Sequence, residues 1–379
     1  MAAKEGQGSQ GDGWMIEARE YKDWSAQFHA DHASEPIVMQ LELTYRCPIH
    51  CLHCYADCYN NAASSKNELS TADVKCLMDN LYSAGCLWFT FTGGDPMVRA
   101  DFVELYEYAK DKGFIFSVMT SLAVLTDEML DVMAKKPPFA IDMTLNGVTE
   151  ETYERISQVK GSFDRVMRNI DKVREAGLPL KMKTLLSKNN IHEVDAIKAF
   201  VESKGLTFSP STLIFARLNG DKEPCKHRLS PEEVIKLDYP DAECGVESKK
   251  KPAKIDPEFE ITPGDDRFYR CAIGNWQWHI NPSGRLNICS CVREPSYDIL
   301  NGDVKEGVRF LSEHVKGRRF SKDGECKTCK IWHMCHSCPG KAQLETGDEE
   351  APVDYFCDLA KKQAENMTRL KSLEGVQKD

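Results

Sequence analysis

Hydrophobic residues between Glu35 and Ile214 follow two alternating patterns. Short apolar runs, typical of buried strands, alternate with longer segments in which apolar residues recur every three or four positions, as on amphipathic helices. The predicted strands are Ile37–Thr44, Cys86–Thr92, Phe114–Met119, Phe139–Leu145, Leu180–Leu186 and Leu206–Ile214. Six strands, each followed by a helix or loop, indicate a parallel sheet with right-handed crossovers.

The predicted helices lie between these strands. The first begins at a cap formed by Ser70 and Thr71 and stops at Gly85. The others span Asp101–Lys112 and residues 126–135, 149–158, 163–176 and 191–204. Periodicity alone leaves open whether the sheet stays open or curves into a barrel.

The length of 379 residues suits two domains. The strand–helix alternation ends after Ile214, and the polar stretch from Asn219 to Asp266 is predicted to be a surface loop. We therefore expect four segments: an N-terminal extension that is partly disordered, a strand–helix core, a connector and a cysteine-rich domain. Their expected bounds are 1–35, 36–218, 219–270 and 271–379.

Charge and hydropathy exclude several classes of function. A formal net charge of −10 disfavours nucleic acid as a partner, because phosphate binding requires a basic surface. No apolar run reaches the roughly 18 residues that span a bilayer, so we expect no membrane partner. The N-terminal residues Met1–Gly13 lack the pattern of a secretion signal. These features predict a cytoplasmic protein.

Cysteines are unusually frequent, with sixteen in the chain. Twelve fall in two clusters, at residues 47–58 and 271–357, and in a reducing cytosol such clusters usually bind metal. The scattered cysteines include Cys76, within a helical pattern, and Cys86, at the start of a strand, and both are interpreted as packing residues.

The first cluster contains Cys47, Cys51 and Cys54, with the spacing C-x3-C-x2-C, directly after the first predicted strand. Electron-transfer cubanes are normally closed by four cysteines. Three thiolates leave one iron open to a small molecule, so the loop indicates a cluster that acts on a bound ligand. The competing interpretation is a zinc loop, or three incidental thiols.

This cysteine loop resembles the signature of the radical S-adenosylmethionine (SAM) enzymes. The resemblance implies an α/β fold, a curved and partial (β/α)6 TIM-like barrel, with its functional site at the carboxyl ends of the strands. It also implies a [4Fe–4S] cluster held by the three cysteines, with the amine and carboxylate of SAM on the open iron.

Residues at the ends of the next strands extend the resemblance. Gly93, Gly94 and Asp95 follow the second strand and resemble the GGE-type motif of the family, with Asp where Glu is usual. In the family these glycines let the backbone approach the SAM amine. Thr120 and Ser121 end the third strand, where relatives often contact the ribose.

Further SAM contacts are implied by weaker matches. Thr144 and Asn146 resemble the end of the fourth strand in these enzymes. Arg155 resembles an arginine that faces the SAM carboxylate, or else it is a solvated helix charge. His53 occupies a position often filled by an aromatic residue near adenine, or is a plain loop residue.

The C-terminal cysteines resemble the SPASM domain, which carries two auxiliary [4Fe–4S] clusters. By resemblance, one cluster is held by Cys326, Cys329, Cys335 and Cys357, and the other by Cys271, Cys289 and Cys338. Only two residues separate Cys335 from Cys338, where three are usual. Zinc is the competing ligand, because His333 and His336 lie among these Cys-x2-Cys pairs.

The cluster of Cys271, Cys289 and Cys338, called the inner auxiliary cluster below, lacks one cysteine that the resemblance implies. Relatives often carry it a few residues before the equivalent of Cys271, but Arg267–Arg270 contain none. Cys291, Cys244 or an open iron must complete it. Only Ser290 separates Cys291 from Cys289, and we favour an open iron or Cys244 over Cys291. Cys58 and Cys76 are predicted not to be ligands of any cluster.

The resemblance implies that the enzyme reductively cleaves SAM to a 5′-deoxyadenosyl radical, which abstracts hydrogen from an unactivated C–H bond. The expected substrate is a ribosomally synthesised peptide, which is crosslinked or oxidised. Ser290 stands where sulfatase-maturing relatives carry Asp, which argues against formylglycine formation. The alternatives are modification of a tetrapyrrole side chain in the haem pathway and, from another class, an iron–sulfur electron carrier.

The expected partners follow from this chemistry. Only about 35 residues precede the first strand, so we expect the peptide's leader to be recognised by Gly13–Glu35, by the SPASM surface or by a separate leader-binding protein. The electron donor is expected to be a reductase or a ferredoxin- or flavodoxin-type protein.

Overall fold

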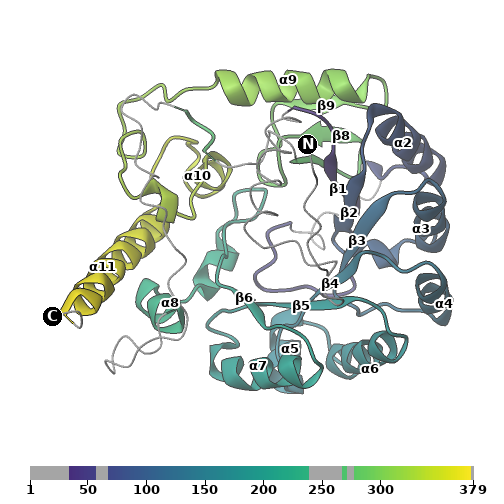
Figure 1. Ribbon diagram of the computed structural model, residues 1–379, viewed down its shortest axis with the longest axis horizontal. Helices are drawn as coiled ribbons and strands as arrows, with labels where there is room; N and C mark the ends of the chain where they lie inside the picture. The colour runs from purple at the N-terminus through teal and green to yellow at the C-terminus, as the bar shows by residue number, and fades with distance from the viewer. Residues whose placement is uncertain (1–33, 57–66, 239–266, 271–276, 377–379) are drawn as a thin grey trace, which may run out of the picture.

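A single curved sheet lies at the centre of the fold. The computed structural model of the chain describes residues 34–56, 67–238, 267–270 and 277–376. The sheet has nine strands in the order β6-β5-β4-β3-β2-β1-β7-β8-β9, so its two edge strands are not paired with each other (Figure 1). The strands are β1 Val38–Thr44, β2 Trp88–Gly93, β3 Ile115–Thr120, β4 Ala140–Thr144, β5 Leu180–Leu185, β6 Ser209–Ser211, β7 Gln277–Ile280, β8 Arg285–Asn287 and β9 Ser296–Asp298.

Helices alternate with the first six strands and cover the outer, convex side of the sheet (Figure 1). They are α2 Thr71–Ala84, α3 Phe102–Asp111, α4 Asp127–Lys135, α5 Glu150–Ser157, α6 Ser162–Glu175 and α7 Val194–Ser203, with short 3-10 turns η2 Pro96–Val98 and η3 Ile191–Glu193. β1 to β6 are mutually parallel, as expected for strands joined by crossover helices. The predicted partial barrel is confirmed.

The remaining helices and 3-10 turns follow β6 in the sequence. They are η4 Glu223–His227, α8 Pro231–Asp238, α9 Val304–Gly317, η5 Trp332–Met334, α10 Pro339–Thr346 and α11 Asp354–Val376. The prediction that residues from 219 onwards form a surface loop is wrong for 223–238. There Leu229 and Val234 are buried against Leu359 of α11, so this segment packs rather than lying free on the surface.

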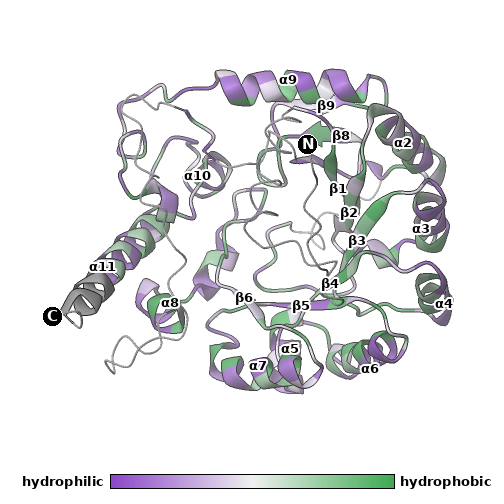
Figure 2. Ribbon diagram, viewed as in Figure 1, coloured by the Kyte–Doolittle hydropathy of each residue, from purple (hydrophilic) through white to green (hydrophobic). Residues whose placement is uncertain are grey.

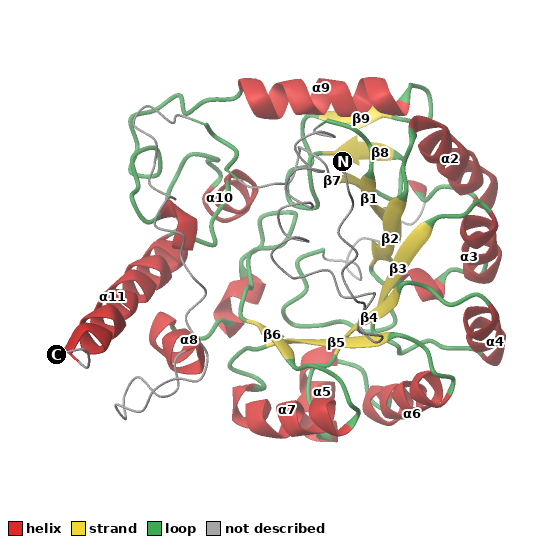
Figure 3. Ribbon diagram, viewed as in Figure 1, coloured by secondary structure: helices red, strands yellow, loops and turns green. Residues whose placement is uncertain are grey.

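β7, β8 and β9 extend the sheet beyond β1 (Figure 3). β7 is parallel to β1, with Val38 opposite Gln277, whereas β8 and β9 continue antiparallel. Strands of three or four residues carry too little periodicity to be recognised in a sequence. The cysteine-rich C-terminal segment therefore begins as part of the sheet that carries β1.

The hydrophobic core lies between the sheet and the outer helices. Figure 2 shows β2 and β3 as hydrophobic ribbons and the helices as mixed, which is the pattern of amphipathic helices packed on a buried sheet. Phe89, Phe91 and Phe116 are fully buried, and the rings of Phe89 and Phe116 stack with centroids 5.1 Å apart. Phe89 and Phe116 are also partners in the parallel pairing of β2 with β3.

The opposite, inner face of the sheet is polar around β1. Met39, Leu41 and Leu43 of β1 join the hydrophobic core, so the alternation of a strand places Gln40 and Glu42 on the other face. Glu42 is nevertheless only 2% exposed. A polar inner face is what a barrel that binds a charged ligand requires.

Most predicted boundaries agree with the structure to within two residues. The predicted N-cap of α2 is confirmed: Ser70 and Asp73 form a capping box, and Gly85 ends the helix with φ +97°. The sixth strand is much shorter than predicted, because only Ser209–Ser211 pair with β5. Its side chains are exposed, so no buried face holds a longer strand in place.

A buried ion pair attaches the C-terminal helices to the end of the barrel. The guanidinium group of Arg228 binds the carboxylate of Glu345 in α10 and donates to the carbonyl of Ile214 over 2.8 Å. It also lies over the rings of Tyr355 and Phe356, 4.5 and 4.9 Å from their centroids.

No helix in the described part of the chain is long and apolar enough to cross a bilayer.

We predict that Arg228→Ala lowers the free energy of unfolding by about 3 kcal/mol, because it leaves the Glu345 carboxylate buried without its partner. The matched control is Lys226→Ala, which removes an exposed pair with Glu223 and should leave the free energy of unfolding nearly unchanged. Urea unfolding of both variants measures the difference. Equal effects would contradict a structural role for the buried pair.

Candidate cluster and cofactor site

The cysteine loop begins where β1 ends, at the carboxyl edge of the parallel sheet. Cys47, Cys51 and Cys54 are partly buried, and the amide of Cys54 donates to the carbonyl of Cys51 over 3.0 Å. The loop thus lies at the edge where parallel α/β barrels place their active sites.

The C-terminus of α5 holds the middle of this loop. The amide of His50 donates to the carbonyl of Ser157 over 2.8 Å, and that of Leu52 donates to Ile156 over 3.0 Å. The last carbonyls of a helix have no partner within the helix, so they are available to bind another segment. The cysteine loop supplies that partner.

The glycines after β2 hold the start of the loop. The amide of Gly94 donates to the carbonyl of Thr44 over 2.8 Å, and the amide of Asp95 to that of Arg46 over 2.9 Å. A Cβ on Gly93 would lie 2.1 Å from the oxygen of Thr44, and one on Gly94 would lie 2.3 Å from that of Arg46. Only glycine permits this approach. Contact of these glycines with SAM stays a prediction.

Asp95 joins the ends of β2 and β3. Its buried carboxylate accepts hydrogen bonds from the amide of Met97 over 3.1 Å, from the Thr120 hydroxyl over 2.9 Å, and from the Ser121 amide and hydroxyl over 2.9 and 2.6 Å. Burial raises the pKa of Asp95, although these hydrogen bonds oppose the shift. The structure thus brings together three residues predicted to bind SAM, with their polar groups bonded to one another.

Asn146 is the predicted residue most directly connected to the cysteines. Its side-chain Nδ2 donates to the sulfur of Cys51 over 3.4 Å, and its backbone carbonyl accepts from the side chain of Asn190 over 3.0 Å. Its Oδ1 is buried and has no hydrogen-bond partner within the described residues. An unpartnered buried acceptor is costly, and its position beside a cluster cysteine fits a ligand that donates a hydrogen bond, such as an amine.

Tyr153 was not predicted, yet it lies beside the same group. Its hydroxyl is buried, is unpartnered among the residues that the structure describes, and is close enough to Cys51 and Asp95 for their charges to raise its pKa, after the larger effect of burial. In the sequence Tyr153 occupies an ordinary core position of an amphipathic helix. No pattern in the sequence therefore marked it as a site residue.

The buried thiols of the loop favour a bound cationic group. Burial raises the pKa of Cys51 to about 12 and also raises that of Cys47, so their thiolates need a cationic partner. Zinc and an iron–sulfur cluster would each supply such a partner. In residues 34–56, 67–238, 267–270 and 277–376, no three Cys, His, Asp or Glu side chains are placed to hold one metal ion.

The other predicted SAM contacts stay predictions. Arg155 donates to the carbonyl of Asn189 over 2.6 Å, and its side chain is 39% exposed. This hydrogen bond shows that Arg155 is not simply a solvated helix charge. Thr144 is exposed at the end of β4. Burial, with His227 nearby, lowers the pKa of His53 to about 4, so the ring is neutral at pH 7.

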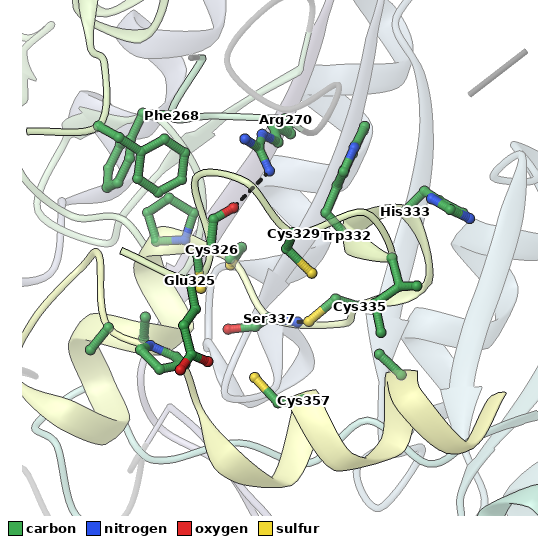
Figure 4. Close-up of a pocket in the computed structure, with 18 of the residues that line it drawn as sticks. Phe268, Arg270, Glu325, Cys326, Cys329, Trp332, His333, Cys335, Ser337 and Cys357 are labelled. Atoms are coloured by element: carbon green, nitrogen blue, oxygen red, sulfur yellow. Dashed lines mark hydrogen bonds between the residues drawn. The ribbon is translucent and has the colours of Figure 1, made fainter. Parts of the chain in front are cut away.

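The predicted outer auxiliary cysteines share one cavity of about 340 Å³. Cys329, Cys335 and Cys357 point towards a common space, with Cys326 on the same loop (Figure 4). Arg270 supports this loop by donating to the carbonyl of Cys326 over 3.0 Å. The four cysteines that the resemblance groups together thus line one cavity, and their role as cluster ligands stays a prediction.

The predicted inner auxiliary cysteines border a second cavity, of about 360 Å³, which is lined by Cys289 and Cys338. Cys271 lies outside the described residues, as do Cys58 and Cys244. Cys76 is exposed on α2, so its interpretation as a packing residue is wrong, whereas Cys86 is buried.

The close spacing of Cys289 and Cys291 does not keep Cys291 away from the inner site, because residues i and i+2 of a strand lie on one face. β8 ends at Asn287, and the backbone bends over residues 288–291. Cys289 and Cys291 line the same cavity. The interaction between the two neighbouring thiols lowers the pKa of Cys289 and raises that of Cys291.

A buried charged cluster on the inner face was also missed from the sequence. Glu42 Oε2 lies 3.3 Å from His279 Nε2 and 3.2 Å from Arg293 Nη2. Burial alone would raise the pKa of Glu42, but the charges of His279 and Arg293 hold it below its ordinary value. A carboxylate within the apolar run of β1 was the available signal.

Comparisons with known proteins agree with this site. Residues 41–201 match the sequence model of the Radical SAM superfamily. The AdoMet-dependent heme synthase of Methanosarcina barkeri is 23% identical over 85% of this chain and 97% of that protein. The PqqA peptide cyclase of Rhizobium meliloti is 28% identical over 67% of each. Streptococcus suis SuiB bound to S-adenosylmethionine has the same fold, with a TM-score of 0.65 and 14% identity over 90% of this chain and 84% of that one.

Residues 41–201 match the radical SAM superfamily, and the chain shares the fold of SuiB. The protein is therefore an enzyme that uses a [4Fe–4S] cluster and SAM, with further cysteines that fit auxiliary clusters. The electron-carrier alternative, which has no need of a SAM site, is set aside by this finding.

We predict that Gly94→Ala destabilises the protein by about 2 kcal/mol, as overpacking against rigid backbone does, and lowers the iron retained by the cysteine loop. The matched control is Gly317→Ala at the end of α9, where a Cβ meets nothing within 4 Å. Chemical unfolding and iron analysis of both variants test this. An unchanged Gly94→Ala protein would show that the close approach is not required.

Proposed function

We propose that this enzyme modifies a ribosomally synthesised peptide by C–H abstraction, forming a crosslink or an oxidised side chain. The observation that carries the proposal is that the SAM-type cysteine loop follows β1, while the second cysteine cavity is lined by β1 and by its neighbour β7. Relatives with names that specify peptide cyclisation, and SuiB, whose structure was also determined with its precursor peptide SuiA, support a peptide substrate.

In this proposal Cys47, Cys51 and Cys54 hold the cluster that binds SAM. When bound, the cluster and SAM together supply the 5′-deoxyadenosyl radical that removes hydrogen from the substrate. Asn146 donates to the Cys51 sulfur and offers its Oδ1 as an acceptor, while Asp95 fixes the neighbouring strand ends. The protein thus orients the cofactor, which carries the difficult chemistry.

The auxiliary cysteines are proposed to hold clusters that accept or relay the electron released after bond formation. The cavity of Cys326, Cys329, Cys335 and Cys357 would hold one, and the cavity of Cys289 and Cys338 the other. Cys335 and Cys338 border both cavities, so the two sites are neighbours. A reductase or a ferredoxin- or flavodoxin-type protein is the proposed donor, and a separate leader-binding protein is a further proposed partner.

A second candidate is modification of a tetrapyrrole side chain. It is favoured by the extent of the match to the heme synthase, which covers 85% of this chain, against 67% for the peptide cyclase. Both candidates use the same cysteine loop, so they differ only in what enters the barrel.

We predict that replacing Cys47, Cys51 and Cys54 together with Ala abolishes formation of 5′-deoxyadenosine but leaves the auxiliary iron bound. Each [4Fe–4S] cubane holds four irons, so the variant should lose about four per chain. Iron analysis and product chromatography after anaerobic reduction measure both quantities. Continued 5′-deoxyadenosine formation would refute the assignment of the SAM site.

The substrate class is tested by anaerobic incubation of the wild-type enzyme with SAM, a reductant and a short peptide encoded beside its gene. We expect the peptide to lose two hydrogens, about 2 Da by mass spectrometry, as a crosslink or desaturation requires. A parallel reaction contains an iron tetrapyrrole that carries propionate groups. Conversion of the tetrapyrrole alone would replace the peptide proposal with the second candidate.

A further inference from the structure

The segment after β8 places two cysteines, separated by one residue, beside one cavity. Cys289 and Cys291 both line the cavity of about 360 Å³ that Cys338 also borders. Residues i and i+2 of an extended segment lie on one face, so this spacing allows both thiols to serve one site. The backbone bends over residues 288–291, where the segment meets Cys338 at the cavity.

Hydrogen bonds within the segment hold the bend. The amide of Val292 turns back to donate to the sulfur of Cys289 over 3.3 Å. Nε of Arg293 donates to the carbonyl of Ser290, at the centre of the bend, over 3.0 Å. The turn is therefore formed by specific contacts of its own residues.

The same arginine attaches the bend to the barrel. Nη2 of Arg293 lies 3.2 and 3.3 Å from the two carboxylate oxygens of Glu42, and Nη1 donates to the hydroxyl of Tyr45 in the cysteine loop. Glu42 is 2% exposed, so this pair is shielded from water, where a charge pair interacts strongly. The position of Cys291 is thus set relative to β1.

The start of α10 approaches the bend from the other side. Cys338 is the N-cap of α10, and Gly340 lies two residues further on. A Cβ on Gly340 would lie 3.1 Å from Cβ of Cys291 and 2.8 Å from Cγ2 of Val292. Glycine at this position lets the segment that carries Cys338 come close to Cys291.

We propose that Cys291 is a thiolate ligand of the inner auxiliary iron–sulfur cluster, together with Cys289 and Cys338. This rests on the proposed auxiliary clusters and reverses the preference for an open iron or Cys244. Three thiols from two segments face one cavity, and the contacts around Arg293 and Gly340 bring those segments together.

The test uses the Cys47/Cys51/Cys54→Ala protein, so that all bound iron belongs to auxiliary sites. After anaerobic reconstitution this protein should hold about eight irons per chain, since each cubane contains four. Cys291→Ala, Cys291→Ser and Cys244→Ala are added singly. The matched control is Cys225→Ala, which removes a partly buried thiol that borders neither cavity.

We expect Cys291→Ala to lose about four irons, or to convert one cubane to a three-iron cluster with its own electron paramagnetic resonance signal. Cys291→Ser supplies an oxygen ligand of nearly the same shape, so it should retain iron but change the spectrum and reduction potential of one cluster. Cys225→Ala and Cys244→Ala should match the background. A packing role would leave the Ser variant's spectrum unchanged.

Two results would overturn the inference. Cys291→Ala and Cys291→Ser could both keep the full iron content and an unchanged spectrum, or Cys244→Ala alone could lose the cluster. Absence of iron from the background protein would instead refute the auxiliary clusters themselves, and zinc in its place would identify a zinc site. Circular dichroism of each variant identifies any loss of iron that follows from misfolding.

Discussion

The close backbone contact between the turn after β2 and the start of the cysteine loop is the constraint on which the site depends. Gly93 and Gly94 place their strand end so near Thr44 and Arg46 that no side chain fits between them. The contact fixes the first turn of the loop, and the C-terminus of α5 fixes its middle. Three cysteines can therefore be held at the edge of the sheet without a hydrophobic core of their own.

The same sheet connects the two cysteine-rich parts of the chain. β1 pairs with β2 on one side and with β7 on the other, so the loop after β1 and the segment after β8 share a common support. The buried pair of Glu42 and Arg293 adds a side-chain link across this junction. Such a pair stabilises little by itself, but its loss leaves a buried charge, so it favours one arrangement of the two parts.

Much of the fold could be predicted because its signals are local. Strands and helices of the first half are long enough to show periodicity, and Ser70 and Gly85 mark the ends of α2 by their own chemistry. β7 could not be predicted, since four residues show no period and their partner, β1, is far away in the sequence. The placement of Cys291 beside Cys338 could not be predicted, because the contacts of Arg293 with Ser290 and Glu42 join distant parts of the chain and no local pattern reveals them.

The site was predictable as a set of residue types but not as a network. Spacing identified the cysteine loop and the Gly93–Asp95 turn, whereas the burial of Tyr153 and the bonds of Asp95 emerged only from the structure. The most direct test of the central claim is anomalous diffraction at the iron edge from crystals of anaerobically reconstituted enzyme with SAM. The account predicts iron beside Cys47, Cys51 and Cys54, with SAM next to Asn146. Zinc, or no metal, at these cysteines would contradict it.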